Sequence, residues 1–171
     1  MLNIDQLDVE LLQALERDAR TGVVELAATL GISRNTVQSR IRRLEEAGLV
    51  AGYRPVLDLA RAGLVVQAFI ALETEQGGLT NIVEELVAIP QVLEVHAITG
   101  REDLLVRVAT ATQPDLQRLI ERIVGFAGVV HSNTALTLTT PLPHRAVPPL
   151  ADIAKDTGWG RSAATPKKRA D

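Results

Sequence analysis

The sequence predicts an α+β protein with two domains, a three-helix domain over residues 1–52 and a βαββαβ domain over residues 64–140. Three observations support this prediction. The first fifty residues carry apolar side chains at helical spacing, interrupted by glycines. Residues 64–140 alternate β-rich runs with amphipathic stretches. The chain has no cysteine and is 46% hydrophobic, which is typical of a globular core without disulfides.

The first domain is predicted to contain three helices. Asp5 is a suitable N-cap for the first, whose apolar stripe is Leu7, Leu11, Ala14 and Leu15. A short second helix is expected over residues 24–30. Ser33 is the predicted N-cap of the third, whose apolar positions are Val37, Ile41 and Leu44. After Gly48, short apolar pieces around Gly52 predict a small hairpin or an extended exit strand.

The second domain is predicted to alternate strands and helices. Strands are expected over residues 64–72, 92–99, 104–109 and 129–139. One helix carries the stripe around residues 82–87, and another begins at the Thr-x-x-Asp capping box of residues 112–115. This order suits a ferredoxin-like sheet with both helices on one face. The uncovered face would favour self-association into a two-fold homo-oligomer.

The remaining segments are a connector over residues 53–63 and a tail over residues 141–171. The tail holds 5 of the 8 prolines, and its 6 basic and 3 acidic residues give it a net charge of +3. We predict a flexible basic tail with a water-exposed Trp159, able to contact phosphates or else inert. Residues 150–154 alternatively pack back as a short turn.

The pair of helices around residues 31–33 predicts a helix-turn-helix, in which the second helix enters the DNA major groove. Residues 33–44 contain four arginines and no acidic residue, although the whole chain has a net charge of −3. Arginine reads guanine, and Asn or Gln reads adenine. The expected contacts with double-stranded DNA are Ser33, Arg34, Asn35, Thr36, Gln38, Ser39, Arg42 and Arg43. A solvated basic face of a helical bundle is the alternative.

Other classes of function find little support. Aromatic residues make up only 2% of the chain, too few for single-strand binding by base stacking. No apolar run reaches the length of a membrane span, and no signal peptide is evident. His96 and His131 are expected on opposite edge strands, where they cannot share a metal. We therefore expect no enzyme, cofactor, metal site or membrane association, and a cytoplasmic location.

A series of short motifs runs along the chain: DVELLQAL at 8–15, DAR at 18–20, ELA at 25–27, GIS at 31–33, RIRRLEEAGLV at 40–50, GY at 52–53, PxV at 90–92, TGxxD at 99–103 and GV at 128–129. In this combination and order they resemble the Lrp/AsnC (leucine-responsive/asparagine-operon, feast-famine) regulators. The resemblance covers residues 4–140. It implies a winged helix-turn-helix joined to a ligand-sensing domain, dimers that often assemble into octamers, and an amino-acid effector.

The resemblance implies that the effector lies near the turn of residues 99–103, at subunit contacts. The expected effector residues are Thr99, Gly100, Arg101, Glu102 and Asp103; a purely structural turn is the alternative. Glu102 stands where the family usually has an aromatic residue. The sequence therefore predicts a sequence-specific transcriptional regulator modulated by a small molecule. The alternative is a small-molecule-binding module that acts on a protein partner without specific DNA binding.

Overall fold

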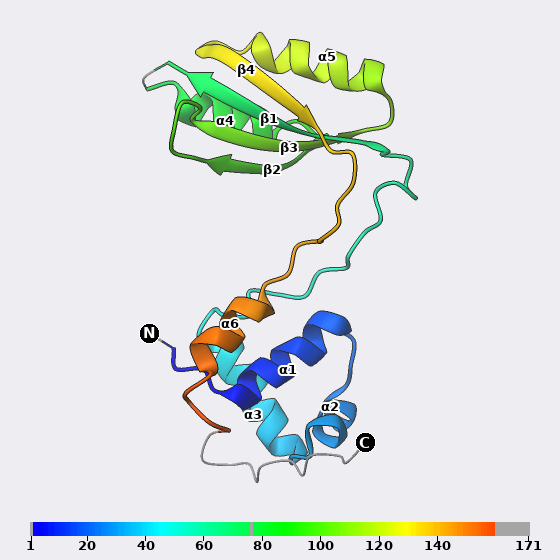
Figure 1. Ribbon diagram of the computed structural model, residues 1–171, viewed down its shortest axis with the longest axis vertical. Coiled ribbons are helices and arrows are strands. Elements are labelled where there is room, and N and C mark those ends of the chain that lie inside the picture. Colours follow the sequence, from blue (N-terminus) through cyan, green and yellow to red (C-terminus); the bar gives the residue numbers. More distant parts are fainter. Residues whose placement is uncertain (1, 76, 160–171) are drawn as a thin grey trace. The chain divides into compact units, whose positions relative to one another are not determined.

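The computed structural model describes residues 2–75 and 77–159, which form two compact units (Figure 1). One unit contains the chain up to Pro55 and again from Pro143 onward. The other unit runs from Val56 to Leu142. The chain therefore contributes to the first unit twice, before and after the second unit. Within the described residues, no helix is long and apolar enough to cross a bilayer.

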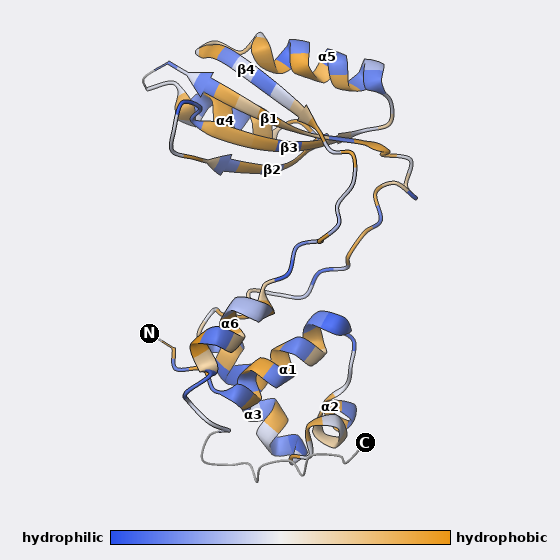
Figure 2. Ribbon diagram, in the orientation of Figure 1, coloured by the Kyte–Doolittle hydropathy of each residue, from blue (hydrophilic) through white to orange (hydrophobic). Residues whose placement is uncertain are grey.

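The first unit contains the three predicted helices, α1 (Gln6–Arg17), α2 (Val23–Leu30) and α3 (Arg34–Glu46). Asp5 caps α1: its carboxylate accepts the Asp8 amide at 2.9 Å, and the Asp8 carboxylate accepts the Asp5 amide at 3.0 Å. Each helix buries one face, as the mixture of polar and apolar residues along it indicates (Figure 2). The largest buried side chains are Leu7, Leu11, Leu26, Val37 and Leu44.

The hairpin considered after the third helix is not formed. Residues 51–58 form no strand, so within the described chain the helix-turn-helix has no β wing. Val56 and Leu57 are exposed, which shows that the segment has few apolar neighbours to pack against. A two-stranded hairpin without a surface to pack on is only marginally stable, which is consistent with its absence here.

The prediction of a flexible tail over residues 141–171 is wrong over residues 147–159, and the alternative that residues 150–154 pack back is borne out in part. Val147–Ala154 form a helix, α6, whose first and last residues are buried in the core of the first unit. Trp159, predicted to be water-exposed, is half-buried against the same core. The prolines misled the prediction, because Pro148 and Pro149 lie in the first turn of α6, where no amide donor is required. Residues 160–171 lie outside the described residues.

α6 packs antiparallel along α1. At one end, Glu16 of α1 accepts the Ala146 amide at 2.9 Å, just before α6 begins. At the other end, the Gln6 side chain donates to the Lys155 carbonyl oxygen at 3.1 Å. Val9 and Leu12 are buried, and helical spacing places them on α1 between these two ends. α1 is therefore buried on two sides, against α2 and α3 on one and against α6 on the other.

The second unit has the predicted βαββαβ order. Its elements are β1 (Val66–Thr74), α4 (Leu79–Val87), β2 (Val92–Ala97), β3 (Leu104–Thr110), α5 (Gln113–Val124) and β4 (Val129–Leu136). The antiparallel sheet has the strand order β2-β3-β1-β4, which confirms the ferredoxin-like prediction (Figure 1). Thr112 caps α5 by accepting the Asp115 amide at 3.2 Å, at the predicted capping box.

The two faces of the sheet differ. One face packs against α4 and α5 through Ala68, Ile70, Leu72, Leu104, Val106 and Val108. Strand register places Phe69, Leu105 and Ala135 on the opposite face, where Phe69 is 36% exposed. On that face Arg107 donates to Glu94 at 3.1 Å and to Gln67 at 3.3 Å. The face of the sheet opposite α4 and α5, the free face, therefore carries an apolar centre beside a network of polar side chains.

Candidate functional site

The turn between α2 and α3 fixes the start of the candidate recognition helix. Gly31 ends α2 at φ 67°, in the left-handed region that glycine adopts without strain. The Ser33 hydroxyl caps α3 by accepting the Thr36 amide at 3.1 Å. Val37 and Leu44 anchor the helix because both are fully buried. The turn thus gives α3 a defined start and a defined exposed face.

The exposed face of α3 is polar and basic. Six of the eight predicted DNA-contacting residues are exposed: Ser33 at the cap, and Arg34, Asn35, Gln38, Ser39 and Arg42 on the helix. Asn35, Ser39 and Arg42 follow one another at i, i+4 and i+7, so they share a stripe opposite the buried residues. Thr36 is half-buried, and its hydroxyl lies 2.8 Å from that of Ser33, which ties both hydroxyls to the cap.

Arg40 and Arg43 have a structural role that the sequence did not reveal. Arg40 lies 2.7 Å from the carboxylates of both Asp5 and Asp8, and its side chain is only 12% exposed. Arg43 pairs with Asp8 and donates to the Asn3 carbonyl oxygen at 3.1 Å. These four side chains connect the start of α1 to the middle of α3. Arg43, predicted as a phosphate contact, is thus engaged within the protein, with its side chain 42% exposed.

Two members of this cluster, Asp8 and Arg40, have shifted pKa values. Burial raises the pKa of Asp8, but the hydrogen bond from the Asp5 amide and those from Arg43 and Arg40 outweigh burial, so the pKa of Asp8 falls below its usual range. Burial likewise opposes the charge of Arg40, yet its bonds to Asp5 and Asp8 raise its pKa overall. Both shifts favour the charged forms, so Asp8 and Arg40 face each other as an ion pair at neutral pH.

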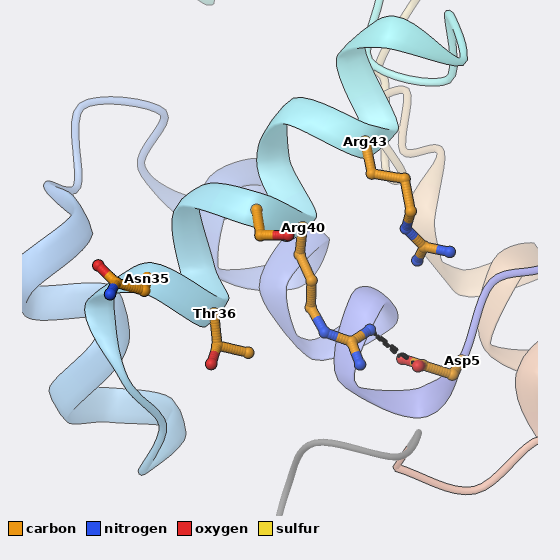
Figure 3. Close-up of a pocket in the computed structure, with 6 residues that line it drawn as sticks. Asp5, Asn35, Thr36, Arg40 and Arg43 are labelled. Atoms are coloured by element: carbon orange, nitrogen blue, oxygen red, sulfur yellow. Dashed lines mark hydrogen bonds and ion pairs between the residues drawn. The ribbon is translucent and has the colours of Figure 1, made fainter.

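A polar hollow of about 430 Å³ adjoins this cluster on one side of α3 (Figure 3). Its lining is Asp5, Asn35, Thr36, Ser39, Arg40 and Arg43. Asn35 and Ser39 belong to the exposed stripe, whereas Arg40 points to Asp5 at the start of α1 (Figure 3). The hollow thus joins the candidate base-reading stripe to the ion-pair cluster.

The candidate effector turn lies between β2 and β3. Asp103 is engaged there: its carboxylate accepts the Thr74 amide at 2.7 Å and the Thr74 hydroxyl at 3.0 Å, and its own amide donates to Leu72 at 2.8 Å. Thr99, Gly100 and Arg101 are exposed, and Glu102 is half-buried. Arg101 lies 3.5 Å from Glu73. Asp103 therefore holds the turn to the end of β1, while the three residues before Glu102 face solvent.

The histidines of the sheet are separated as predicted. His96 is on β2 and His131 on β4, which are the two edge strands. His96 lies 3.3 Å from Glu94 on its own strand. Among the residues that the structure describes, no three His, Asp or Glu side chains are grouped as a metal site would require.

Comparison with known proteins agrees with this architecture. Residues 4–45 match the AsnC-type helix-turn-helix domain, and residues 67–147 match the Lrp/AsnC ligand binding domain. An uncharacterised HTH-type transcriptional regulator of Pyrococcus horikoshii is 32% identical over 141 residues, covering 80% of this chain and 94% of that protein. The HTH-type regulator AldR of Mycolicibacterium smegmatis is 30% identical, covering 78% of this chain and 81% of that protein.

The fold has solved relatives as well. The structure of E. coli AsnC superimposes with a TM-score of 0.79 at 27% identity, covering 86% of this chain and all of that chain. The two matched domains together span most of the chain, in the same order as the two predicted domains. The chain belongs to the Lrp/AsnC family of HTH-type transcriptional regulators.

Proposed function

We propose that this regulator binds double-stranded DNA through α3 and reads bases with its exposed stripe. The observation that carries the proposal is the arrangement of α3, a capped and buried helix whose exposed positions hold Asn35, Ser39 and Arg42. These side chains can bond base edges in the major groove, where each base pair presents a distinct pattern. Arg34 and Gln38 are exposed beside this stripe. Ser33, Thr36 and Arg43 border it and lie close to where phosphates run.

The second unit is the effector-binding and oligomerisation domain in this proposal. Its match to the Lrp/AsnC ligand binding domain supports a small-molecule effector, and the family resemblance favours an amino acid. The exposed groups at Thr99, Gly100 and Arg101, with Glu102 beside them, could receive its charged ends. Asp103 acts mainly by positioning the turn, because Thr74 already occupies one of its carboxylate oxygens.

The free sheet face supports a homodimer, which larger assemblies up to octamers would extend. Phe69 is partly exposed at its centre, and an apolar patch of this kind usually packs against another protein surface. A two-fold dimer would present two α3 helices to half-sites about one duplex turn apart, so near-palindromic operators are expected. Light scattering at micromolar concentration should give an even multiple of the protomer mass. A folded monomer would refute this part.

The test of DNA binding is selection of bound duplexes from a random pool, with and without a mixture of the twenty amino acids. Enrichment of a near-palindromic sequence supports the proposal, and a change of enrichment with amino acids supports the effector. The variant Arg118→Gln is the matched control, because it removes an exposed arginine from α5 rather than from α3. Absence of any enriched sequence would favour the alternative, a module that acts on a protein partner.

A further inference from the structure

The first unit is connected to the second by two segments of chain. The first segment leaves the end of α3 and reaches β1 at Val66, and the second leaves β4 at Leu136 and reaches α6 at Val147. On the sheet the two segments begin side by side, because β1 and β4 are paired and the Thr137 amide donates to the Gln67 carbonyl oxygen at 2.9 Å. Both connections therefore leave the second unit from the same end of two neighbouring strands.

On the first unit the two segments are attached to different helices. The first segment is held to the end of α3, where the Tyr53 hydroxyl donates to Glu45 at 3.0 Å. The second segment is held to the end of α1, where Glu16 accepts the Ala146 amide at 2.9 Å. The unit that carries the recognition helix thus has two separate attachment points rather than one.

α6 anchors the second segment along its whole length. Its first and last residues, Val147 and Ala154, are buried in the core of the first unit. Just beyond it, the Gly158 carbonyl oxygen accepts the Gln6 amide at 3.0 Å, and Trp159 packs against the same core. These contacts run from the start of α6 to past its end, so the helix is fixed to α1 at both ends.

The contacts of α1 carry this restraint to the recognition helix. Asp8, at the start of α1, is 0% exposed and pairs with Arg40 and Arg43 of α3. Leu11 of α1 and Val37 of α3 are fully buried in one core cluster. Tightly packed interiors yield little to strain, so helices joined in this way move as one body. Whatever restrains α6 therefore also restrains the orientation of α3.

One connection and two connections restrain a folded unit differently. A unit attached at one point can rotate about that point as far as its linker permits, whereas a second attachment point removes much of this freedom. Residues 138–145 can extend to at most about 29 Å, because a chain spans up to about 3.6 Å per residue. Residues 54–65 are shortened by a turn, in which the Leu64 amide donates to the Leu59 carbonyl oxygen at 2.9 Å. Both connections are therefore short, and together they limit the orientations that α3 can adopt.

We propose that α6 is a second anchor of the DNA-binding unit, which restricts the orientation of α3 and makes the regulator selective for the spacing between half-sites. The inference rests on the proposed binding of a two-fold dimer to DNA through α3. Inserting base pairs between two half-sites both moves one of them and rotates it about the duplex axis. A loosely attached unit can follow this change, whereas a unit held at two points cannot. A misplaced half-site is then left unbound, and the gain from binding both half-sites at once is lost.

The first test slackens the second connection without removing α6. A flexible Gly/Ser linker of about 20 residues is inserted between Leu142 and Pro143, at the boundary of the two units. Affinities are measured for the selected operator and for one whose half-sites are moved apart by about five base pairs, or half a duplex turn. The altered spacing should weaken binding by the unmodified chain about 10²-fold, and binding by the variant less than about tenfold. An equal preference for the selected spacing in both proteins would overturn the inference.

Controls separate the anchor from other effects of the insertion. The same linker added after Asp171 lengthens the chain outside the connection, so it should leave the spacing preference unchanged. In the variant with the inserted linker, Trp159 emission should match that of the unmodified chain, because α6 stays packed. A duplex with a single half-site should bind both proteins equally, because α3 is unaltered. A linker after Asp171 that relaxes the preference as much as the insertion does would overturn the inference.

The second test separates α6 from the core. The substitution Ala154→Asp places a charge at a buried position of α6, so it should relax the spacing preference as the inserted linker does. The matched control is Asp152→Asn, whose side chain is 72% exposed on the same helix, and it should keep the preference. If Ala154→Asp shifts Trp159 emission to longer wavelength and still keeps the full spacing preference, the anchor has no role in operator choice.

The two proposals fail in different ways. If the unmodified chain binds no duplex at all, the proposed function is wrong and this inference falls with it. If the unmodified chain selects an operator and the variant with the inserted linker shows the same dependence on half-site spacing, only the role of α6 as a second anchor is wrong.

Discussion

The carboxylate of Asp8 connects the start of α1 to α3, and its removal should strongly destabilise the first unit. Its side chain is 0% exposed. It accepts hydrogen bonds from the Asp5 amide at 3.0 Å, from Arg40 at 2.7 Å and from Arg43. The substitution Asp8→Asn keeps the size of the side chain while removing its charge. Arg40 would then keep its pair with Asp5, whereas Arg43 would lose its pair with Asp8.

The expected loss depends on the burial of each partner. Breaking a buried ion pair by removing one member costs about 3–5 kcal/mol. Two features reduce this value: Arg40 keeps Asp5, and Arg43 can turn to water because its side chain is 42% exposed. We therefore expect Asp8→Asn to lower the free energy of unfolding of the first unit by about 2–4 kcal/mol. Against a typical domain stability of about 5–15 kcal/mol, this loss is large.

Trp159 provides the assay, because it is the only tryptophan and packs against the core of this unit. Urea unfolding followed by its emission reports on the first unit alone. Asp18→Asn is the matched control: its pair with Arg20, at 3.6 Å, joins side chains that are 55% and 93% exposed, so its loss should cost less than about 0.5 kcal/mol. A loss for Asp8→Asn as small as that for Asp18→Asn would refute the reasoning.

The same cluster predicts a pH dependence. Folding lowers the pKa of Asp8, since its hydrogen bonds outweigh the effect of burial. A carboxyl with a depressed pKa in the folded state adds stability above its unfolded-state pKa, and this stability is lost as the pH falls through the folded-state value. The difference in unfolding free energy between the unmodified chain and Asp8→Asn should therefore be largest at neutral pH and shrink on acidification. A difference that stays constant down to the acid transition would contradict it.

Three further predictions test other contacts. Asp103→Ala should destabilise the second unit by about 1–3 kcal/mol in thermal unfolding, because it leaves the Thr74 amide without its acceptor. Asp103→Asn should cost less, and equal losses in the two variants would argue against a positioning role. Ala154→Asp places a charge at a position that is only 1% exposed, so it should separate α6 from the core of the first unit. The emission of Trp159 should then shift to longer wavelength, and unchanged emission would contradict the packing of α6 on this core. Arg34→Ala should reduce affinity for the selected operator by about 1–3 kcal/mol and relax the base preference in a binding assay. Equal losses of affinity on all duplexes would show that Arg34 does not read a base.

Most elements of the fold could be predicted because their signals are local. Helices α1 to α5 each carry an apolar stripe, and Asp5, Ser33 and Thr112 cap their helices as their sequence positions indicate. α6 could not be predicted in the same way, since its stripe is short and its prolines resemble those of an irregular chain. Its stability comes from a tertiary partner, the second buried side of α1 around Val9. The sequence alone does not indicate that this side of α1 is buried, because its partner α6 has to be known first.

The candidate site, like the fold, could be predicted only where its signals are local. Local position indicates which residues α3 exposes, and Arg34, Asn35 and Arg42 are exposed as expected. Counting the arginines of α3 as one basic surface overestimated its charge. Arg40 and Arg43 bond carboxylates more than thirty residues away in the sequence, and no local pattern contains such a pairing.

The internal use of these two arginines has a consequence for how the regulator would hold DNA. Nonspecific attraction to DNA comes from basic side chains near phosphates, and affinity rises with the number of such contacts. With Arg40 and Arg43 engaged, α3 alone retains only Arg34 and Arg42 as exposed basic groups. A single recognition helix would therefore discriminate bases better than it attracts the duplex. Tight binding then requires additional contacts, which the proposed two-fold dimer would supply by doubling the recognition helices.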